Sequence, residues 1–474
     1  MLAIVVSRAD EASEHVGERL LDFAEWETRT DDTRADADGG GTYSVLRAGT
    51  ERGVETEGSA GESERVELRT FEDLHLHLER VATAFGGDGE SAGDRPELLV
   101  FASRHSGETG PLLTAHFTGN VGAAEYGGRT GELAEAAPAA LSRVVGALDR
   151  RAPEGYGVGV ECTHHGPSRV GCPSLFVEVG SGTTQWRDAD AARAVAAAIL
   201  TLRAGETHGD RTVVGLGGGH YAPRFERVLR ETAWDVGHVA ADWSLADLDR
   251  ESETGRETLR RVFERSGADR ALIDGDRPDL AAVVADLGYE VVGESWLRAV
   301  DDRPLGVVET VEERLGRVAD GVALGERETT TVAVRRLPSE LASEAEGIDP
   351  EAAWSVVAGE TVAFETTVGG SRLGDRVALP VGDAGGATAD AGEAYDELVA
   401  GLAGVLREKF ETVERRDGAV VATRTAFDPE LARAAGVPEG PAFGRLADGR
   451  PVEVDGETIV PGTVHRERRR EFET

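Results

Sequence analysis

Apolar runs alternate with helical segments from Leu2 to Val292, and this alternation constrains the fold more than any other feature of the chain. Short apolar runs of about 4–8 residues are typical of strands that are buried on both faces. When such strands alternate with helices, they form a mostly parallel or mixed sheet with helices on both faces. The predicted strands are Leu2–Ser7, Glu97–Ala102, Gly157–Thr163, Ser174–Val179 and Arg211–Leu216; the predicted helices are Glu11–Ala24, Phe71–Phe85, Glu132–Asp149 and Asp188–Leu202. The sequence therefore predicts an α/β fold.

The pattern changes after residue 310. Glu328–Arg336 and Thr361–Val368 have the polarity of solvated strands, and Glu393–Val413 is an amphipathic helix. We therefore expect a larger domain over residues 1–310 and a smaller C-terminal α+β accessory domain over residues 311–474. Within the larger domain, residues 28–65 are rich in Asp, Glu, Gly, Thr and Ser, which predicts a flexible acidic insertion.

The chain is strongly acidic. It has 88 Asp and Glu against 51 Lys and Arg, a formal charge of -37, and Lys409 is its one lysine. In an ordinary cytosol this self-repulsion would destabilise a compact state. At about 1 M salt the screening length falls to roughly 3 Å, which removes most of the repulsion. Because hydrophobic periodicity runs through most of the sequence, the composition favours a folded, halophilic protein over a disordered acidic chain.

Cysteine use and hydropathy predict the compartment. Cys162 and Cys172 are the only cysteines, so there is no disulfide framework. Met1–Arg8 has the pattern of a short strand rather than of a signal peptide, and no apolar run approaches the roughly 20 residues of a membrane helix. We therefore expect a cytoplasmic protein with no membrane partner, and we expect it to be a monomer.

Histidines gather in three loops that each follow a predicted strand. The first loop contains Ser103, Arg104 and His105, with His116 and Asn120 further along. Ligands bind at the carboxyl ends of strands in open parallel sheets, so these side chains suit anion contacts or acid–base work. Ser103 is equally compatible with a plain turn.

The second loop has the densest set of donor atoms. Its sequence is Glu161-Cys162-Thr163-His164-His165-Gly166-Pro167. Zinc binds imidazole nitrogen, thiolate sulfur and carboxylate oxygen. Adjacent histidines in an extended chain point to opposite faces, so His164 and His165 face one metal only if the chain turns there. The alternative interpretation is a polar loop that contains a buried Cys162.

The third loop is rich in glycine. Gly217, Gly218, Gly219 and His220 follow the strand that ends at Leu216. Consecutive glycines let backbone N–H groups approach an anion, but the spacing matches neither a P-loop nor a dinucleotide fingerprint. A simple tight turn is the alternative. His238 further along is a candidate ligand or a core residue.

Together these motifs resemble the archaeal D-aminoacyl-tRNA deacylase family. The matching segments, in the same order, are Ala102-Ser103-Arg104-His105-Ser106, His116-Phe117-Thr118-Gly119-Asn120, Glu161 to Pro167, Glu178-Val179-Gly180-Ser181 with Trp186, and Gly217-Gly218-Gly219-His220-Tyr221. The resemblance covers about residues 1–310. It implies hydrolysis of the ester between a D-amino acid and the terminal ribose of tRNA, dependence on one or two zinc ions, and a fold like that of peptidyl-tRNA hydrolases and nucleoside phosphorylases.

The candidate residues follow from these motifs. The catalytic candidates are His165, His220, His105 and Thr163; the substrate-binding candidates are Ser103, Arg104, Asn120, Gly217, Gly218 and Gly219; the zinc-ligand candidates are His164, His165, His220 and Glu161. In this hypothesis a histidine or a bound zinc activates water, and the glycine loop stabilises the oxyanion. Arg104 and Arg169 are candidates for holding phosphate or the terminal adenosine.

Three alternatives remain open at this stage. A nucleoside phosphorylase-like enzyme would use the glycine loop for phosphate, another zinc-dependent hydrolase would use the same histidines on a different substrate, and a binding module would hold metal without turnover. An acidic protein repels tRNA, so tRNA binding requires a local arginine patch. Arg466, Arg468, Arg469 and Arg470 are one candidate, although a solvated tail explains them equally.

Overall fold

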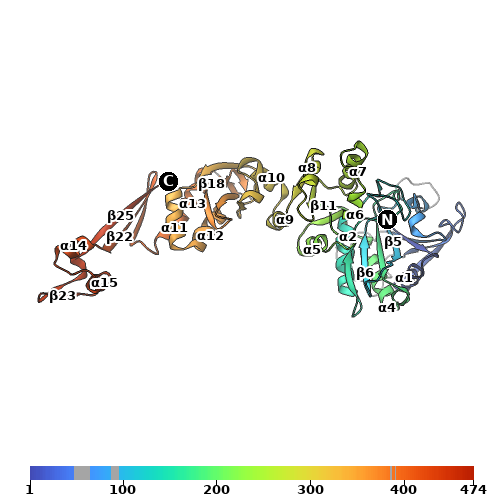
Figure 1. Cartoon of the computed structure of the whole chain (residues 1–474), viewed down its shortest axis with the longest axis horizontal. Coiled ribbons are helices and arrows are strands. Elements are labelled where there is room, and N and C mark those ends of the chain that lie inside the picture. Colours follow the sequence, from blue (N-terminus) through green and yellow to red (C-terminus); the bar gives the residue numbers. More distant parts are fainter. Residues whose placement is uncertain (47–64, 87–94, 385–386, 390) are drawn as a thin grey trace. The chain divides into compact units, whose positions relative to one another are not determined.

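A computed structural model describes residues 1–46, 65–86, 95–384, 387–389 and 391–474 (Figure 1). Within this part of the chain, the contacts divide the structure into two compact units, Met1–Asp301 and Asp302–Thr474. The first unit contains a large mixed sheet and a smaller parallel sheet, and the second contains antiparallel sheets with helices. The predicted α/β class of fold is confirmed.

The large sheet has eight strands in the order β2-β3-β4-β1-β5-β10-β6-β9. Strands β4, β1, β5 and β10 are parallel, β6 is antiparallel to β10, and β9 is parallel to β6. The bounds are β1 Leu2–Ser7, β2 Trp26–Asp31, β3 Gly41–Leu46, β4 Val66–Phe71, β5 Leu98–Arg104, β6 Leu112–His116, β9 Gly157–Val160 and β10 Ser174–Gly180. The sheet is mixed because β6 enters it in the opposite direction.

Three helices and an irregular layer cover this sheet. The irregular layer contains the residues between Leu78 and Phe85 together with Val170 and Cys172. Helices α1 (Glu11–Asp22), α2 (Pro138–Arg151) and α4 (Ala189–Leu200) pack on one another and on the central strands. A second core cluster joins inward side chains of β1, β5 and β10 to residues between Leu78 and Phe85 and to Val170 and Cys172. The irregular layer therefore provides loops, rather than long helices, above the ends of the central strands.

The smaller sheet of the first unit is all parallel, in the order β12-β11-β13-β14. Its strands and helices are β11 Thr212–Leu216, α5 Pro223–Glu231, β12 Asp235–Ala240, α6 Asp242–Ala246, α7 Glu253–Glu264, β13 Arg270–Ile273, α8 Pro278–Asp286, β14 Glu290–Val292 and α9 Glu294–Ala299. The alternation in the sequence predicted one sheet, but the structure has two, because β11 pairs with β12 and β13 and not with β10.

The second unit is an α+β structure. A four-stranded antiparallel sheet, β15-β17-β18-β16, and a three-stranded sheet, β21-β22-β25, share a core with three helices. The bounds are α10 Leu305–Arg314, β15 Val322–Leu324, β16 Val332–Arg336, α11 Ser339–Ile348, α12 Pro350–Glu360, β17 Ala363–Thr367, β18 Arg372–Pro380, α13 Ala391–Leu406, β21 Thr412–Arg416, β22 Ala419–Phe427, α14 Pro429–Ala434, α15 Pro441–Ala447, β23 Val452–Val454, β24 Glu457–Ile459 and β25 His465–Glu473.

Three local predictions need correction. The insertion predicted at 28–65 begins as an ordered strand pair, β2 with β3, and its residues 47–64 lie outside the described residues. The helix predicted at Phe71–Phe85 is instead two 3₁₀ turns, His75–His77 and Val81–Ala84, because Arg80 and Ala82 donate backbone hydrogen bonds to Arg169 and Val170 rather than along a helix. Helix α2 starts at Pro138 rather than Glu132, since Glu132–Leu133 pairs as the short strand β8.

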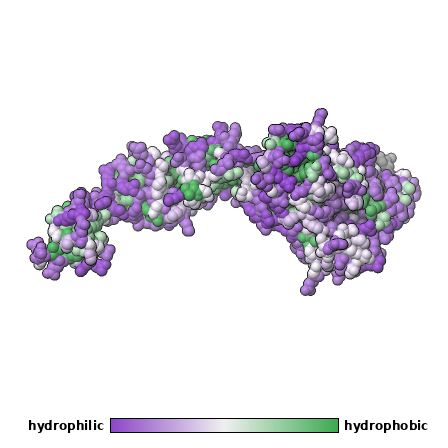
Figure 2. Space-filling view, in the orientation of Figure 1, coloured by the Kyte–Doolittle hydropathy of each residue, from purple (hydrophilic) through white to green (hydrophobic). Residues whose placement is uncertain are grey.

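The surface is largely hydrophilic on the face that Figure 2 shows. Large exposed hydrophobic residues of the described chain occur singly, and they are Leu21, Tyr126, Trp243, Val334, Val368 and Val460. Single exposed apolar residues are normal for a protein surface. Among the described residues, no helix is long and apolar enough to cross a membrane.

Two fully buried histidines predict a loss of stability in mild acid. Burial lowers the pKa of His75 and of His238 to about 4 in each case, so folding favours their neutral forms. Their contribution is complete above the unfolded pKa near 6.5 and is lost as pH falls towards 4, at up to about 1.4 kcal/mol per pH unit for each histidine. We expect His238→Gln to flatten the dependence of the free energy of unfolding on pH between 6.5 and 5, measured by chemical denaturation in molar KCl. At pH 8, the difference in free energy of unfolding between this variant and the wild type measures the packing cost alone. An unchanged slope would contradict the prediction.

Candidate active site

Histidines and glutamates gather where β5, β6, β9 and β10 meet. His105 follows β5, His116 ends β6 and Glu161 follows β9. Glu178 lies within β10, two residues beyond Phe176, which pairs with His116. Because side chains alternate along a strand, Glu178 and His116 lie on the same face of the sheet. That face is the one covered by the irregular layer.

His220 reaches this group from the smaller sheet. The glycine loop after β11 returns to the end of β9, where Tyr221 forms a bridge with Glu161. The backbone N–H of Cys162 donates to the His220 carbonyl at 2.8 Å, and the N–H of Ala222 donates to the Val160 carbonyl at 3.1 Å. The two sheets are therefore joined at the site, and the junction positions His220.

Three imidazoles have the same orientation and converge. His116, His164 and His165 each bond a backbone carbonyl oxygen through Nδ1, which leaves Nε2 of each ring as the acceptor. One nitrogen from each ring lies within 4.8 Å of the others. The carbonyl partners are Phe117 at 2.8 Å, Cys162 at 2.9 Å and Gly166 at 2.9 Å. Imidazoles that ligate a metal are usually held by such a second hydrogen bond.

A backbone turn brings the two adjacent histidines to one side. His165 has a φ of 50°, in the left-handed region, and the ring centroids of His164 and His165 are 4.4 Å apart. In an extended strand these rings would lie on opposite faces. Both histidines therefore belong to one group, as the sequence allowed only if the chain turned here.

Glu161 is the centre of the polar contacts. Its Oε2 accepts a hydrogen bond from Nε2 of His220 at 2.8 Å and lies 3.7 Å from Nε2 of His164. Its Oε1 lies 3.1 Å from Nδ1 of His105. A second carboxylate, Glu178, lies 3.7 Å from both His105 and His116. The Nε2 of His105 is also 2.9 Å from the Tyr221 hydroxyl.

The two carboxylates have opposite pKa shifts. Burial alone would raise the pKa of Glu161, but His105 and His220 lower it well below its ordinary value. Burial raises the pKa of Glu178, and His116 offsets only part of this effect. Two neighbouring carboxylates with opposite shifts are typical of acid–base sites.

The pKa values of the imidazoles are also shifted in opposite directions. The hydrogen bond to Glu161 raises the pKa of His220, whose side chain is 38% exposed. Burial lowers the pKa of His164 to about 3 and that of His165 well below its ordinary value, and neighbouring imidazoles add to both shifts. His220 is therefore the solvent-facing basic group, and His164 and His165 are neutral.

The donor atoms form four overlapping groups that could hold a metal ion, within the part of the chain that the structure describes. These groups are His116, His164 and His165; Cys162, His164 and His220; His105, Glu161 and His220; and His116, Glu161 and Glu178. Nε2 of His116 and Oε1 of Glu161 are buried without a hydrogen bond to any described residue. Buried polar atoms without partners are costly, and a cation held by the three imidazoles would satisfy Nε2 of His116.

A pocket of about 450 Å³ opens onto these groups. Its wall includes Ser103, which donates to Asp10 at 3.1 Å, and Arg104, whose guanidinium lies 5.1 Å above the Trp186 ring. Tyr126, 66% exposed, also lines the pocket. The predicted residues Ser103, Arg104, His105, His164, His165 and His220 all line this pocket.

Besides the buried Glu161, which contacts His105, His164 and His220, two predicted residues do not line the pocket. The Thr163 hydroxyl contacts Nδ1 of His238 at 2.9 Å and accepts from the Val239 N–H at 3.2 Å, so it supports the packing of the two sheets. His238 is correspondingly a core residue. The Asn120 amide donates to the Gly127 carbonyl at 3.0 Å and braces the loop before the pocket.

The glycine loop is also absent from the pocket. The N–H of Gly217 donates to the Ala240 carbonyl at 2.8 Å, so it is not available to an oxyanion. A Cβ at Gly217 would approach the side chains of Asp242 and Asp274, and one at Gly218 would approach Asp274. Both carboxylates are ion-paired, Asp242 with Arg277 and Asp274 with Arg224. The loop contributes by returning the chain to His220, and its positive φ values, 105° and 83°, are accessible to glycine at little cost.

Three residues of this site were not among the catalytic, binding or zinc-ligand candidates, although His116 was noted with His105 as suited to anion contacts or acid–base work. Glu178 could have been identified as the charged residue within an apolar strand, and His116 as the histidine that ends one. His75 belongs to the segment that the sequence predicted as a helix. The structure instead buries it at the pocket floor, against Phe101 and Phe176.

The fold and the pocket together define an α/β protein with a buried histidine–carboxylate site that is suited to metal binding and acid–base chemistry. Residues 92–292, which include the three converging imidazoles and both glutamates, match the model of the D-aminoacyl-tRNA deacylase family. Over its whole length the chain is 52% identical to the D-aminoacyl-tRNA deacylases of Halorubrum lacusprofundi, of which it covers 96%, and of Natronomonas pharaonis, of which it covers 100%. It is 46% identical to that of Haloarcula marismortui, with both chains fully covered. The chain belongs to the D-aminoacyl-tRNA deacylase family.

A solved structure supports the same fold. The crystal structure of a conserved protein of unknown function is 26% identical to this chain, with a TM-score of 0.51. The match covers 63% of this chain and 96% of that protein.

Proposed function

We propose that the protein hydrolyses the ester bond of D-aminoacyl-tRNA and releases a free D-amino acid and tRNA. Support comes from the full-length relatives that carry this name and from the pocket chemistry. One observation carries the proposal: His164, His165 and His220 line one pocket of about 450 Å³, and the buried Glu161 and His116 lie against these imidazoles. The relatives come from halophilic organisms and the chain carries a charge of -37, so we further propose that it works as a monomer in a salt-rich cytoplasm.

Zinc fits the three-imidazole group best. His116, His164 and His165 supply three nitrogen donors with fixed rings, and catalytic zinc sites commonly use three protein ligands and keep one position open. A bound zinc ion supplies Lewis-acid polarisation of an oxygen atom. Glu161 and His220, proposed from the sequence as further ligands, are then free for proton transfer.

His220 is the proposed general base. Its Nε2–H donates to Glu161, so the neutral ring keeps Nδ1 as an acceptor at the solvent-facing side. Glu161 orients the ring and stabilises its protonated form, as a carboxylate does in a catalytic triad. His220 takes a proton from water as the water oxygen adds to the ester carbon, and the same imidazole returns that proton to the departing ribose oxygen.

The other proposed contacts position these groups. His105 lies against the second oxygen of Glu161 and contacts the Tyr221 hydroxyl, so it restrains both Glu161 and the segment that carries His220. Arg104 and Ser103 line the pocket and offer polar contacts to the terminal nucleotide. We do not retain the phosphorylase alternative, because the glycine loop that it requires does not line the pocket and the Gly217 N–H is held by the Ala240 carbonyl.

Matched D- and L-tyrosyl-tRNA test the proposed activity. In molar KCl we expect fast release of tyrosine from the D-ester alone, loss of that release with a zinc chelator, and recovery when zinc is added back. Release is measured with radiolabelled amino acid. D-selective hydrolysis that resists chelation would keep the function and contradict zinc dependence. A folded protein that hydrolyses neither ester would contradict the function.

Two histidine variants test the proposed roles. His165→Ala and His220→Ala should each reduce kcat by about 100-fold or more, because one removes a fixed imidazole and the other the general base. His77→Ala is the matched control, since His77 is exposed and does not line the pocket. Circular dichroism establishes that each variant is folded. Near-normal turnover in either variant would remove that residue from the mechanism.

Metal content tests the three-imidazole group separately from activity. We expect His116→Gln combined with His164→Gln to abolish stoichiometric zinc binding, measured by competition with a chromophoric chelator, because only one of the three nitrogen donors remains. His77→Gln should bind zinc as the wild type does. Unchanged zinc binding by the double variant would place the metal in the group of His105, Glu161 and His220, the one group of the four that contains neither substituted residue.

A further inference from the structure

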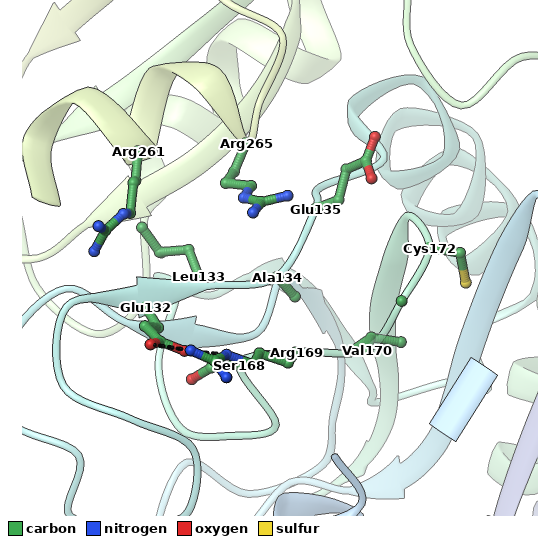
Figure 3. A pocket seen from close by; sticks show the side chains of 11 residues that line it. Glu132, Leu133, Ala134, Glu135, Ser168, Arg169, Val170, Cys172, Arg261 and Arg265 are labelled. Atoms are coloured by element: carbon green, nitrogen blue, oxygen red, sulfur yellow. Dashed lines mark hydrogen bonds and ion pairs between the residues drawn. The ribbon is translucent and has the colours of Figure 1, made fainter. Parts of the chain in front are cut away.

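Two adjoining pockets beside the irregular layer are lined by arginines. One, of about 430 Å³, includes Arg169, Arg261 and Arg265; the other, of about 510 Å³, includes Arg80, Arg95 and Arg169. They share Arg169 and Gly171, so they form one continuous depression, which we name the arginine groove. Figure 3 shows Arg261 and Arg265 extending from α7 and its end towards one side of the first pocket, opposite Arg169.

Most of the charge in this groove is available to a ligand. Arg80, Arg95 and Arg265 are exposed and have no ion pair with any described residue. Arg169 forms a two-bond pair with Glu132 through Nε and Nη2, both at 2.6 Å, which leaves donors on Nη1 and Nη2. Arg261 donates to the Gly131 carbonyl at 2.9 Å and forms a looser ion pair with Glu257 at 3.4 Å, so it keeps fewer free donors than the other arginines.

The groove is unusual for this chain. Acidic residues outnumber basic ones by 88 to 51 overall, but the groove has five arginines against two glutamates, Glu132 and Glu135. One of these glutamates already holds Arg169. Arginine forks match phosphate oxygens in geometry and remain charged at any physiological pH. A cationic groove on an anionic protein therefore favours the binding of a polyanion at this position.

Two segments connect the groove rigidly to the histidine pocket. The first passes from Leu74 and His75 in that pocket to Arg80 in the groove, and the second passes from His164 and His165 to Arg169. They run side by side, since the N–H groups of Arg80 and Ala82 donate to the carbonyls of Arg169 and Val170. The Glu79 carboxylate also accepts from the N–H groups of Ser168 and Arg169.

The separation suits a nucleic acid chain that enters both sites. Arg169 lies four positions after His165 in the chain, so their backbones are at most about 14 Å apart. Nucleotides that directly precede the esterified one therefore reach the groove. An RNA strand presents one phosphate per nucleotide, so two adjoining pockets can each receive a phosphate.

We propose that the arginine groove binds the phosphodiester backbone of the tRNA acceptor end and aligns the ester with the histidine pocket. This inference rests on the proposed function, because it takes tRNA as the substrate. It also explains how a protein of charge -37 holds a polyanion: molar salt screens the distant carboxylates, and the binding depends on a few arginines at short range.

Binding of unacylated tRNA tests the groove without any need for catalysis. We expect Arg80→Gln combined with Arg265→Gln to raise the Kd for tRNA about tenfold and to lower the slope of log Kd against log [KCl] by about 2, one unit for each phosphate that is no longer neutralised by an arginine. Arg150→Gln is the matched control. Arg150 is exposed on α2, has no ion pair with a described residue and lies outside the groove.

Hydrolysis of two substrates separates the groove from the active site. For D-tyrosyl-tRNA, the double variant should raise KM about tenfold and leave kcat within twofold. For D-tyrosyl-adenosine, which keeps the ester and lacks the preceding phosphates, all the proteins should behave alike. The proposed role of the groove would be overturned if the double variant bound tRNA with the same Kd and the same salt slope as the wild type. If the wild type hydrolyses neither ester but the double variant binds tRNA more weakly, the proposed function fails and the groove stands.

Discussion

The buried Glu161 carboxylate organises the site. A charged group with no exposed side-chain surface persists only when its oxygens are satisfied, and here the partners come from three different parts of the chain. His105 comes from the end of β5, His164 from the loop after β9, and His220 from the glycine loop of the other sheet. The demand of one carboxylate thus draws together elements that are far apart in sequence.

The contacts of Glu161 lie at the junction of the two sheets. Three backbone contacts join the two sheets beside Glu161. They are the bridge between Glu161 and Tyr221, the hydrogen bond between Cys162 and His220, and the hydrogen bond between Thr163 and Val239. The smaller sheet therefore contributes a framework and one functional side chain. The large sheet and its loops hold the three converging imidazoles, and the smaller sheet presents the more exposed His220. A rigid junction is required because proton transfer depends on positions within a few tenths of an ångström.

The distribution of charged residues also bears on the site. The chain has 88 acidic against 51 basic residues, yet five arginines line the arginine groove, and two of its segments continue into the histidine pocket. Much of this organisation is visible in the sequence. The strands β1, β5, β10 and β11 were predicted close to their bounds from apolar runs, and Ser103, Arg104, His105, Glu161, His164, His165 and His220 were chosen because they follow such runs. The helix predicted at Phe71–Phe85 was wrong. Its polar spacing is compatible with a helix, but backbone hydrogen bonds to Arg169 and Val170 replace the helical ones.

The sequence by itself determined the α/β class, the loops that carry the histidines and the family, because apolar periodicity and motif order are local properties that survive without coordinates. Only the tertiary structure decided which of those residues meet. It joined Glu178 and His116 through the β6–β10 register, turned His165 to the side of His164, and directed Thr163 into the core instead of the pocket. It also assembled the arginine groove from segments that are up to 185 residues apart, between Arg80 and Arg265. Strand register and loop closure are set by long-range packing, and no local pattern encodes them.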